Sequence, residues 1–114
     1  MTRPIYLDCH ATTPVDPRVV EAMLPYFTEH YGNPSALYSE GRKARTAIEQ
    51  ARRTIAQHLN ASIGEIFFTS GGTESNNTAL KCAVRDLGVE RVITSPTEHH
   101  CVLHAAEALE AFQK

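Results

Sequence analysis

Residues 65–75 read EIFFTSGGTES, and this stretch decides the fold class of the chain. The apolar run Ile66-Phe67-Phe68 is typical of a short buried strand. Two glycines then supply the turn that commonly ends such a run. We therefore predict a strand at Glu65–Thr69 that leads through a glycine turn into a helix.

The residues that follow repeat this alternation. Apolar residues recur at helical spacing from about Thr73 to Leu87, and Gly88 ends the run. Arg91–Thr94 is a second predicted strand, and His100–Phe112 is a further amphipathic helix. Strand, helix, strand and helix in this order indicate a parallel βαβ unit with a crossover helix. The predicted class is therefore α/β. A parallel sheet of two strands is incomplete, so the sequence predicts a domain that continues past residue 114.

Two helices are predicted before the glycine turn. Asp16-Pro17 is an N-cap followed by proline at the first helical position, and Pro25 should kink or split the helix that begins there. A longer helix is predicted from about Ser39 to Leu59. Its apolar stripe is formed by Ala44, Ala47, Ile48, Ala51, Ile55 and Leu59. The arginines of this helix lie off the stripe, and we interpret them as a solvated face.

Composition limits the functional classes. The chain has 114 residues, 42% hydrophobic and 21% charged, with a formal net charge of −2. This balance predicts neither nucleic acid nor an anionic membrane as a partner. No apolar stretch approaches about 18 residues, and the N-terminus lacks a secretory core. Three separated cysteines without a CxxC pair indicate reduced thiols, which predicts a cytoplasmic protein.

The glycine turn is a candidate phosphate site. Gly71 and Gly72 allow the backbone amides to approach a ligand closely, and the new helix favours negative charge at its start. Thr73 and Ser75 can add hydroxyl groups. The stretch is neither a Walker A loop nor a GxGxxG motif, so a small phosphate-bearing ligand fits better than a nucleotide. The alternative is a plain strand-to-helix turn capped by Thr73 or Ser75.

A histidine pair, His99-His100, follows the second predicted strand. In open parallel sheets ligands bind beyond the carboxyl ends of the strands, so this pair should face the same crevice as the glycine turn. Histidine offers a flat ring for stacking and a proton acceptor. One alternative is a helix-start histidine that bonds local backbone. Another is a zinc site of His100, Cys101 and His104, but no fourth ligand is evident and we assign no metal.

Together these pieces resemble the NifS/IscS-like cysteine desulfurases of the class V aminotransferase family. The matching segments lie in the order and spacing of that family and cover nearly the whole chain. They are residues 6–8, 11–17, 31–35, 67–77, 93–95 and 97–99.

The resemblance implies the N-terminal part of a type I fold that binds pyridoxal 5'-phosphate (PLP), in a homodimer. Residues 1–114 would form an N-terminal arm and the first part of the large PLP-binding domain, with no complete second domain. Gly72 and Thr73 match residues that hold the cofactor phosphate. His99 matches the histidine that stacks on the pyridine ring and transfers protons. In this family, L-cysteine yields alanine and its sulfur passes to an enzyme cysteine as a persulfide.

The sequence departs from the family pattern at three points. Tyr38 replaces a histidine that is frequent before the glycine of the next helix. No Ser-x-His-Lys string, which carries the cofactor lysine in the family, occurs in the chain. Cys9, Cys82 and Cys101 match no sulfur-accepting position, and we interpret them as small buried thiols. The chain is therefore expected to be inactive alone.

Three functional hypotheses follow. The first is a fragment of a PLP-dependent cysteine desulfurase that acts on L-cysteine and delivers sulfur to an acceptor protein or an iron-sulfur scaffold protein. The second is another class V enzyme, a selenocysteine lyase or an aminotransferase. The third is a truncated, non-catalytic interaction module.

Overall fold

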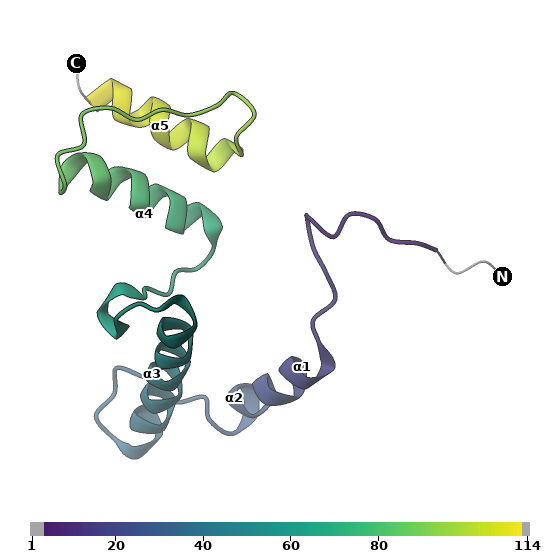
Figure 1. The fold of residues 1–114 in the computed structure, drawn as a ribbon. Helices are drawn as coiled ribbons and strands as arrows, with labels where there is room; N and C mark the ends of the chain where they lie inside the picture. The colour runs from purple at the N-terminus through teal and green to yellow at the C-terminus, as the bar shows by residue number, and fades with distance from the viewer. Residues whose placement is uncertain (1–3, 113–114) are drawn as a thin grey trace. The chain divides into compact units, whose positions relative to one another are not determined.

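The computed structural model describes residues 4–112 and divides the chain into two compact units. The first unit ends at Ile66 and the second begins at Phe67, within the stretch that the sequence singled out. Figure 1 shows the course of the chain through both units.

The first unit begins with two short helices, α1 (Pro17–Met23) and α2 (Pro25–Thr28). Asp16 caps α1 because its carboxylate accepts a hydrogen bond from the Arg18 amide at 2.8 Å. The break between the helices lies at Leu24, immediately before Pro25. Proline has no amide hydrogen and its ring crowds the preceding turn, so the predicted split is confirmed.

The long helix α3 spans Ser39–Leu59, as predicted, and ends at Asn60 in the left-handed conformation with φ 52°. A 3-10 turn, η1 (Ile63–Glu65), follows. Glu65 accepts hydrogen bonds from the amide and the hydroxyl of Ser62 at 2.6 and 2.7 Å, which forms a capping box. These hydrogen bonds lower the pKa of Glu65.

Arg52 of α3 departs from the predicted solvated arginine face. Its guanidinium donates to the backbone carbonyl of Ile66 and to the Glu49 carboxylate, the latter at 3.3 Å. The side chain is 21% exposed, whereas Arg42, Arg45 and Arg53 are exposed residues. Arg52 therefore ties α3 to the residue that follows η1.

The second unit contains α4 (Gly72–Arg85) and α5 (His100–Phe112). The bounds of α5 are those predicted, and α4 ends two residues before the predicted Leu87. Gly88 has φ 68°, a left-handed conformation that suits glycine at the turn after a helix. The two helices lie side by side, and both begin at the same end of the unit (Figure 1).

The two predicted strands are not formed in residues 4–112, where the structure contains only helices, turns and irregular segments. Glu65 ends η1, and residues 66–69 and 91–94 follow extended or irregular paths and form no strand. Phe67 is 80% exposed and Ile93 is 87% exposed, so neither segment lies within a covered sheet. Because a strand needs a neighbouring strand to satisfy its backbone hydrogen bonds, the apolar pattern alone does not produce one. The predicted sheet is therefore not confirmed by this structure, and the two strands stay a prediction.

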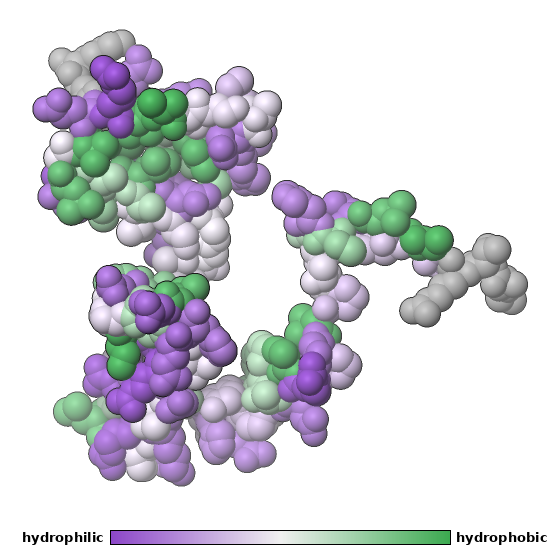
Figure 2. All heavy atoms as spheres, in the orientation of Figure 1, coloured by the Kyte–Doolittle hydropathy of each residue, from purple (hydrophilic) through white to green (hydrophobic). Residues whose placement is uncertain are grey.

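Few apolar side chains are covered in the described part of the chain. The buried hydrophobic residues are Ala44, Ala56, Ala105 and Leu109. On α3, Ile55 is 38% exposed and Leu59 is 67% exposed, so the predicted apolar stripe is largely uncovered. Figure 2 shows hydrophobic atoms at the surface of the chain. No helix within residues 4–112 is both long enough and apolar enough to pass through a bilayer.

Candidate functional site

The glycine turn before α4 is fixed by its own side chains. Glu74 accepts hydrogen bonds from the amide and the hydroxyl of Ser70, both at 2.7 Å. The hydroxyls of Thr69 and Ser75 lie 2.7 Å apart. The hydrogen bonds from Ser70 lower the pKa of Glu74 and hold this carboxylate within the turn.

The space beside the two glycines is open. A methyl group added to Gly71 or Gly72 would meet no atom within 4 Å. Gly71 has φ 167°, an extended conformation that any residue can adopt. Neither local crowding nor backbone conformation therefore requires glycine at these two positions. Open space beside a helix N-terminus leaves room for a ligand oxygen.

The donors at this turn are the first amides of α4 and the hydroxyl of Thr73. The first amides of an α-helix have no carbonyl partner within the helix. The N-cap residue Gly71 supplies no side-chain cap, and Thr73 is exposed, with no partner for its hydroxyl in residues 4–112. Ser75 instead donates to the Gly71 carbonyl at 3.4 Å. The alternative turn capped by Thr73 or Ser75 is thus not what the structure shows.

His99 is the residue immediately before α5. Its Nδ1 accepts a hydrogen bond from the Cys101 amide at 3.2 Å, which is the bond that an N-cap residue makes. The local-backbone role considered for this histidine is therefore present. Because Nδ1 is an acceptor, the hydrogen bonding assigns the proton of the neutral ring to Nε2. The structure gives Nε2 no partner in the described part of the chain, which leaves it free to meet a ligand.

His100 has different surroundings. Its ring lies beside that of His104 on α5, with the ring centroids 5.7 Å apart. The rings of His99 and His100 are 6.2 Å apart and inclined by 62°. Within residues 4–112, no three histidine, cysteine or acidic side chains come together to form a metal site.

Asn76 and Cys101 join the beginnings of α4 and α5. The Asn76 amide donates a hydrogen bond to the Cys101 sulfur at 3.1 Å, and that sulfur lies 3.0 Å from His99 Nδ1. The structure thus brings the helix of the glycine turn next to the helix that His99 caps. Sequence reasoning missed Asn76, because the pairing of residues 25 positions apart follows from the packing of two helices.

The interpretation of the cysteines as buried thiols is wrong. Cys9 and Cys82 are exposed, and Cys101 is only half-buried. The reason is the small core described above, which does not extend to these positions. Cys101 instead lies at the start of α5, where it has polar neighbours.

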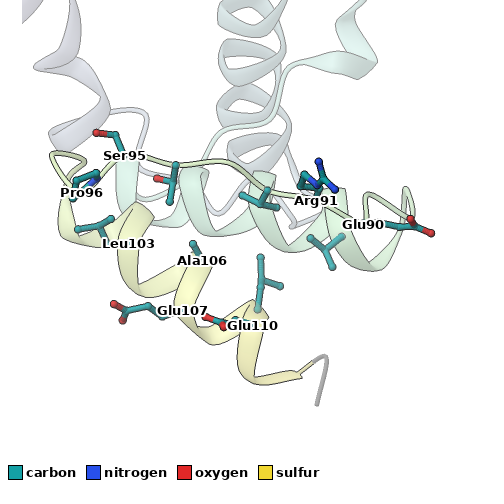
Figure 3. A pocket seen from close by; sticks show the side chains of 12 residues that line it. Glu90, Arg91, Ser95, Pro96, Leu103, Ala106, Glu107 and Glu110 are labelled. Atoms are coloured by element: carbon teal, nitrogen blue, oxygen red, sulfur yellow. The ribbon is translucent and has the colours of Figure 1, made fainter.

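A separate groove runs along the side of α5. It has a volume of about 550 Å³ and separates the helix from residues 90–96. Figure 3 shows Leu103 and Ala106 of α5 near this segment, with Glu107 and Glu110 on the same helix. None of the residues predicted to bind a cofactor lines the groove. We therefore place the candidate site at the helix N-termini.

The chemistry available at this end of the unit suits a small anion. Free amides and the Thr73 hydroxyl are donors, and the dipoles of both helices favour negative charge at their N-termini. His99 Nε2 can donate a hydrogen bond, or accept a proton when the ring is deprotonated there. These donors can bind a phosphate group, and the His99 imidazole can donate or accept a proton beside it.

Comparison with known families identifies one match. Residues 5–114 match the family "Aminotransferase class-V". Among curated relatives, the mitochondrial cysteine desulfurase of Drosophila melanogaster is 52% identical over 111 residues, 95% of this chain and 24% of that protein. The cysteine desulfurase IscS of Methanosarcina thermophila is 53% identical over 109 residues, 93% of this chain and 27% of that protein.

A solved structure is also similar to this chain. The structure of a NifS-like protein superposes with a TM-score of 0.85 at 40% identity and covers 95% of this chain and 30% of that chain. The chain spans about a quarter of the length of the curated relatives that it matches.

Proposed function

Because the chain belongs to the class V aminotransferase family, we propose that it is the N-terminal portion of a PLP-dependent cysteine desulfurase. The complete enzyme would convert L-cysteine to L-alanine and pass the sulfur to an enzyme cysteine as a persulfide. Identity of 50–53% to proteins named cysteine desulfurase supports this reaction over other class V activities. Residues 1–114 would supply the N-terminal arm and the first part of the PLP-binding domain.

The observation that carries the proposal is the open space beside Gly71 and Gly72. An anion placed there meets the free amides of α4 and the Thr73 hydroxyl. Gly72 and Thr73 would hold the cofactor phosphate through charge-assisted hydrogen bonds. When bound, PLP supplies the electron sink for the reaction, while the protein provides orientation and proton transfer.

His99 would stack on the cofactor ring and move a proton. Its Nδ1 is held by the Cys101 amide, so the imidazole is anchored at the start of α5. The opposite nitrogen, Nε2, is then the atom that exchanges a proton with the substrate. A positioned histidine of this kind is a typical general acid or base.

The wider biological setting follows from the same proposal. We expect a homodimer that delivers sulfur to an acceptor or an iron-sulfur scaffold protein. A cytoplasmic location stays a prediction.

A chimera provides the direct test. Residues 5–114 would replace the matching stretch of the Methanosarcina thermophila cysteine desulfurase IscS, to which the chain is 53% identical. We expect the chimera to bind PLP and to release alanine and sulfide from L-cysteine, whereas the 114-residue chain with added PLP releases neither. Both products would be quantified. A folded, PLP-loaded chimera without alanine production would contradict the proposed reaction, and turnover by the short chain that is lost on replacing Lys43 or Lys81 would contradict its expected inactivity.

The role of His99 is tested in the same chimera. His99→Ala should lower kcat by about 10²–10⁴-fold, because a positioned acid or base is lost, and should leave most PLP binding intact. His100→Ala is the matched control and should change kcat little, since its ring lies against His104. PLP absorbance and kcat would be measured for both variants. If His100→Ala lowers kcat and His99→Ala does not, His99 is not the residue that transfers the proton.

A further inference from the structure

Two histidine side chains lie together on the exposed side of α5. His100 and His104 are one helical turn apart, which places both side chains on the same face of the helix. Their ring centroids are 5.7 Å apart, and the ring planes are inclined by 31°. Both residues are exposed, and neither ring forms a hydrogen bond within residues 4–112. Their ring nitrogens are therefore accessible to a ligand from solvent.

The spacing of the two rings suits a metal ion. Two histidines at positions i and i+4 of a helix can bind one zinc ion, because both rings reach the same side. An ion that binds two imidazole nitrogens at about 2.0–2.1 Å holds the ring centroids about 5 Å apart. The observed separation of 5.7 Å is close to that value, so a small rotation of the two side chains brings both rings onto one ion.

Cys101 does not belong to this pair. Its sulfur lies 3.0 Å from His99 Nδ1 and accepts a hydrogen bond from the Asn76 amide at 3.1 Å. Within the part of the chain that the structure describes, no third histidine, cysteine or acidic side chain joins His100 and His104. The three-ligand zinc site considered from the sequence is therefore not formed. The pair offers two nitrogen ligands and leaves the other positions around an ion to water.

We propose that His100 and His104 together bind a divalent transition-metal ion through their two imidazoles. Imidazole is a ligand of Zn²⁺, Cu²⁺ and Ni²⁺, whereas Mg²⁺ and Ca²⁺ require oxygen ligands. The second imidazole binds within the same molecule, so the pair should hold the ion more tightly than a single histidine does. Because the pair lies at the start of α5, the helix dipole opposes the ion and lowers this affinity. The site takes no part in the proposed binding of PLP and does not depend on the desulfurase function.

The test is a calorimetric titration of the 114-residue chain with Ni²⁺ near neutral pH, with the thiols kept reduced. The parent chain should show a saturable Ni²⁺ site. His104→Gln should weaken that site at least about ten-fold, because the second ligand is lost. His58→Gln, which removes a separate exposed histidine of α3, is the matched control and should bind Ni²⁺ like the parent. A parent chain without a saturable site, or equal affinity of His104→Gln and His58→Gln, would overturn the proposal.

Three further variants separate a two-histidine site from the alternatives. His100→Gln should lose as much affinity as His104→Gln, and the double variant should lose little more, because either change already breaks the chelate. Cys101→Ser should keep the parental affinity. Far-UV circular dichroism would check that each variant has the parental helix content. Additive losses in the double variant would show two independent histidines, and a loss in Cys101→Ser as large as that in His104→Gln would show a site that contains the thiol. Either result contradicts the proposal.

Discussion

Within residues 4–112 the Thr73 hydroxyl has no hydrogen-bond partner, and it lies beside Gly71 and Gly72, where an added methyl group would meet no atom within 4 Å. The neighbouring carboxylate, Glu74, is held by Ser70 and therefore does not occupy the free amides of the helix. Side-chain hydrogen bonds thus fix the turn, while its donors stay available to an anion.

The first residue-scale prediction concerns this hydroxyl. In the chimera, Thr73→Val should weaken PLP retention by about 1.5–3 kcal/mol, because one charge-assisted hydrogen bond to the phosphate is lost. Thr78→Val, an exposed threonine farther along α4, is the matched control. Equilibrium dialysis against PLP measures both. Equal retention by the two variants would remove Thr73 from the phosphate site.

At the scale of elements, the helices follow from local sequence signals. The Asp16 cap, the proline at position 25 and the Ser62–Glu65 capping box each fix an end of a helix or turn. The loop before α3 is fixed differently, because it packs closely against the first turns of that helix. Gly41 is buried there, and an added methyl carbon would lie 2.5 Å from the Ala36 carbonyl oxygen and 2.6 Å from that of Asn33.

Gly41→Ala should therefore destabilise the first unit. Alanine gains about 1 kcal/mol of helix propensity over glycine, but overpacking against two backbone oxygens costs about 1–3 kcal/mol or more, so the clash should prevail. Gly64→Ala is the control, since a methyl group there would meet nothing within 4 Å. Thermal unfolding followed by circular dichroism should show a lower midpoint for Gly41→Ala alone. A midpoint equal to or above that of Gly64→Ala would show that the loop can move away.

At the scale of the whole molecule, the chain contains helices whose apolar faces are mostly uncovered. Outside the helices, Phe67 and Ile93, at the centre of the two predicted strands, are also strongly exposed. The structural relative superposes on 95% of the chain, and the chain covers 30% of that relative. The backbone path is therefore shared with a protein about three times longer, in which further segments can pack on these faces.

Hydrogen exchange can test whether the two predicted strands form only when further strands are present to pair with them. In the 114-residue chain, the amides of Phe67, Thr69 and residues 92–94 should exchange rapidly, because these segments form no strand there. In the chimera the same amides should be protected, as expected for central strands of a parallel sheet. The amides of α3 serve as a reference that is helical in both proteins. Rapid exchange at both segments in a folded chimera would reject the predicted strands altogether.

Local patterns in the sequence determined the helices and the family. Helical periodicity specifies α3 and α5, and the Asp16 cap and Pro25 specify ends of α1 and α2, because such signals act over a few residues. The glycine turn and His99 stood out in the sequence for the same reason, and their roles stay predictions. The sheet was not determined locally, since pairing depends on distant strands. Only the tertiary structure placed Asn76 against Cys101 and left Cys9 and Cys82 exposed, because burial and contact depend on which helices pack together.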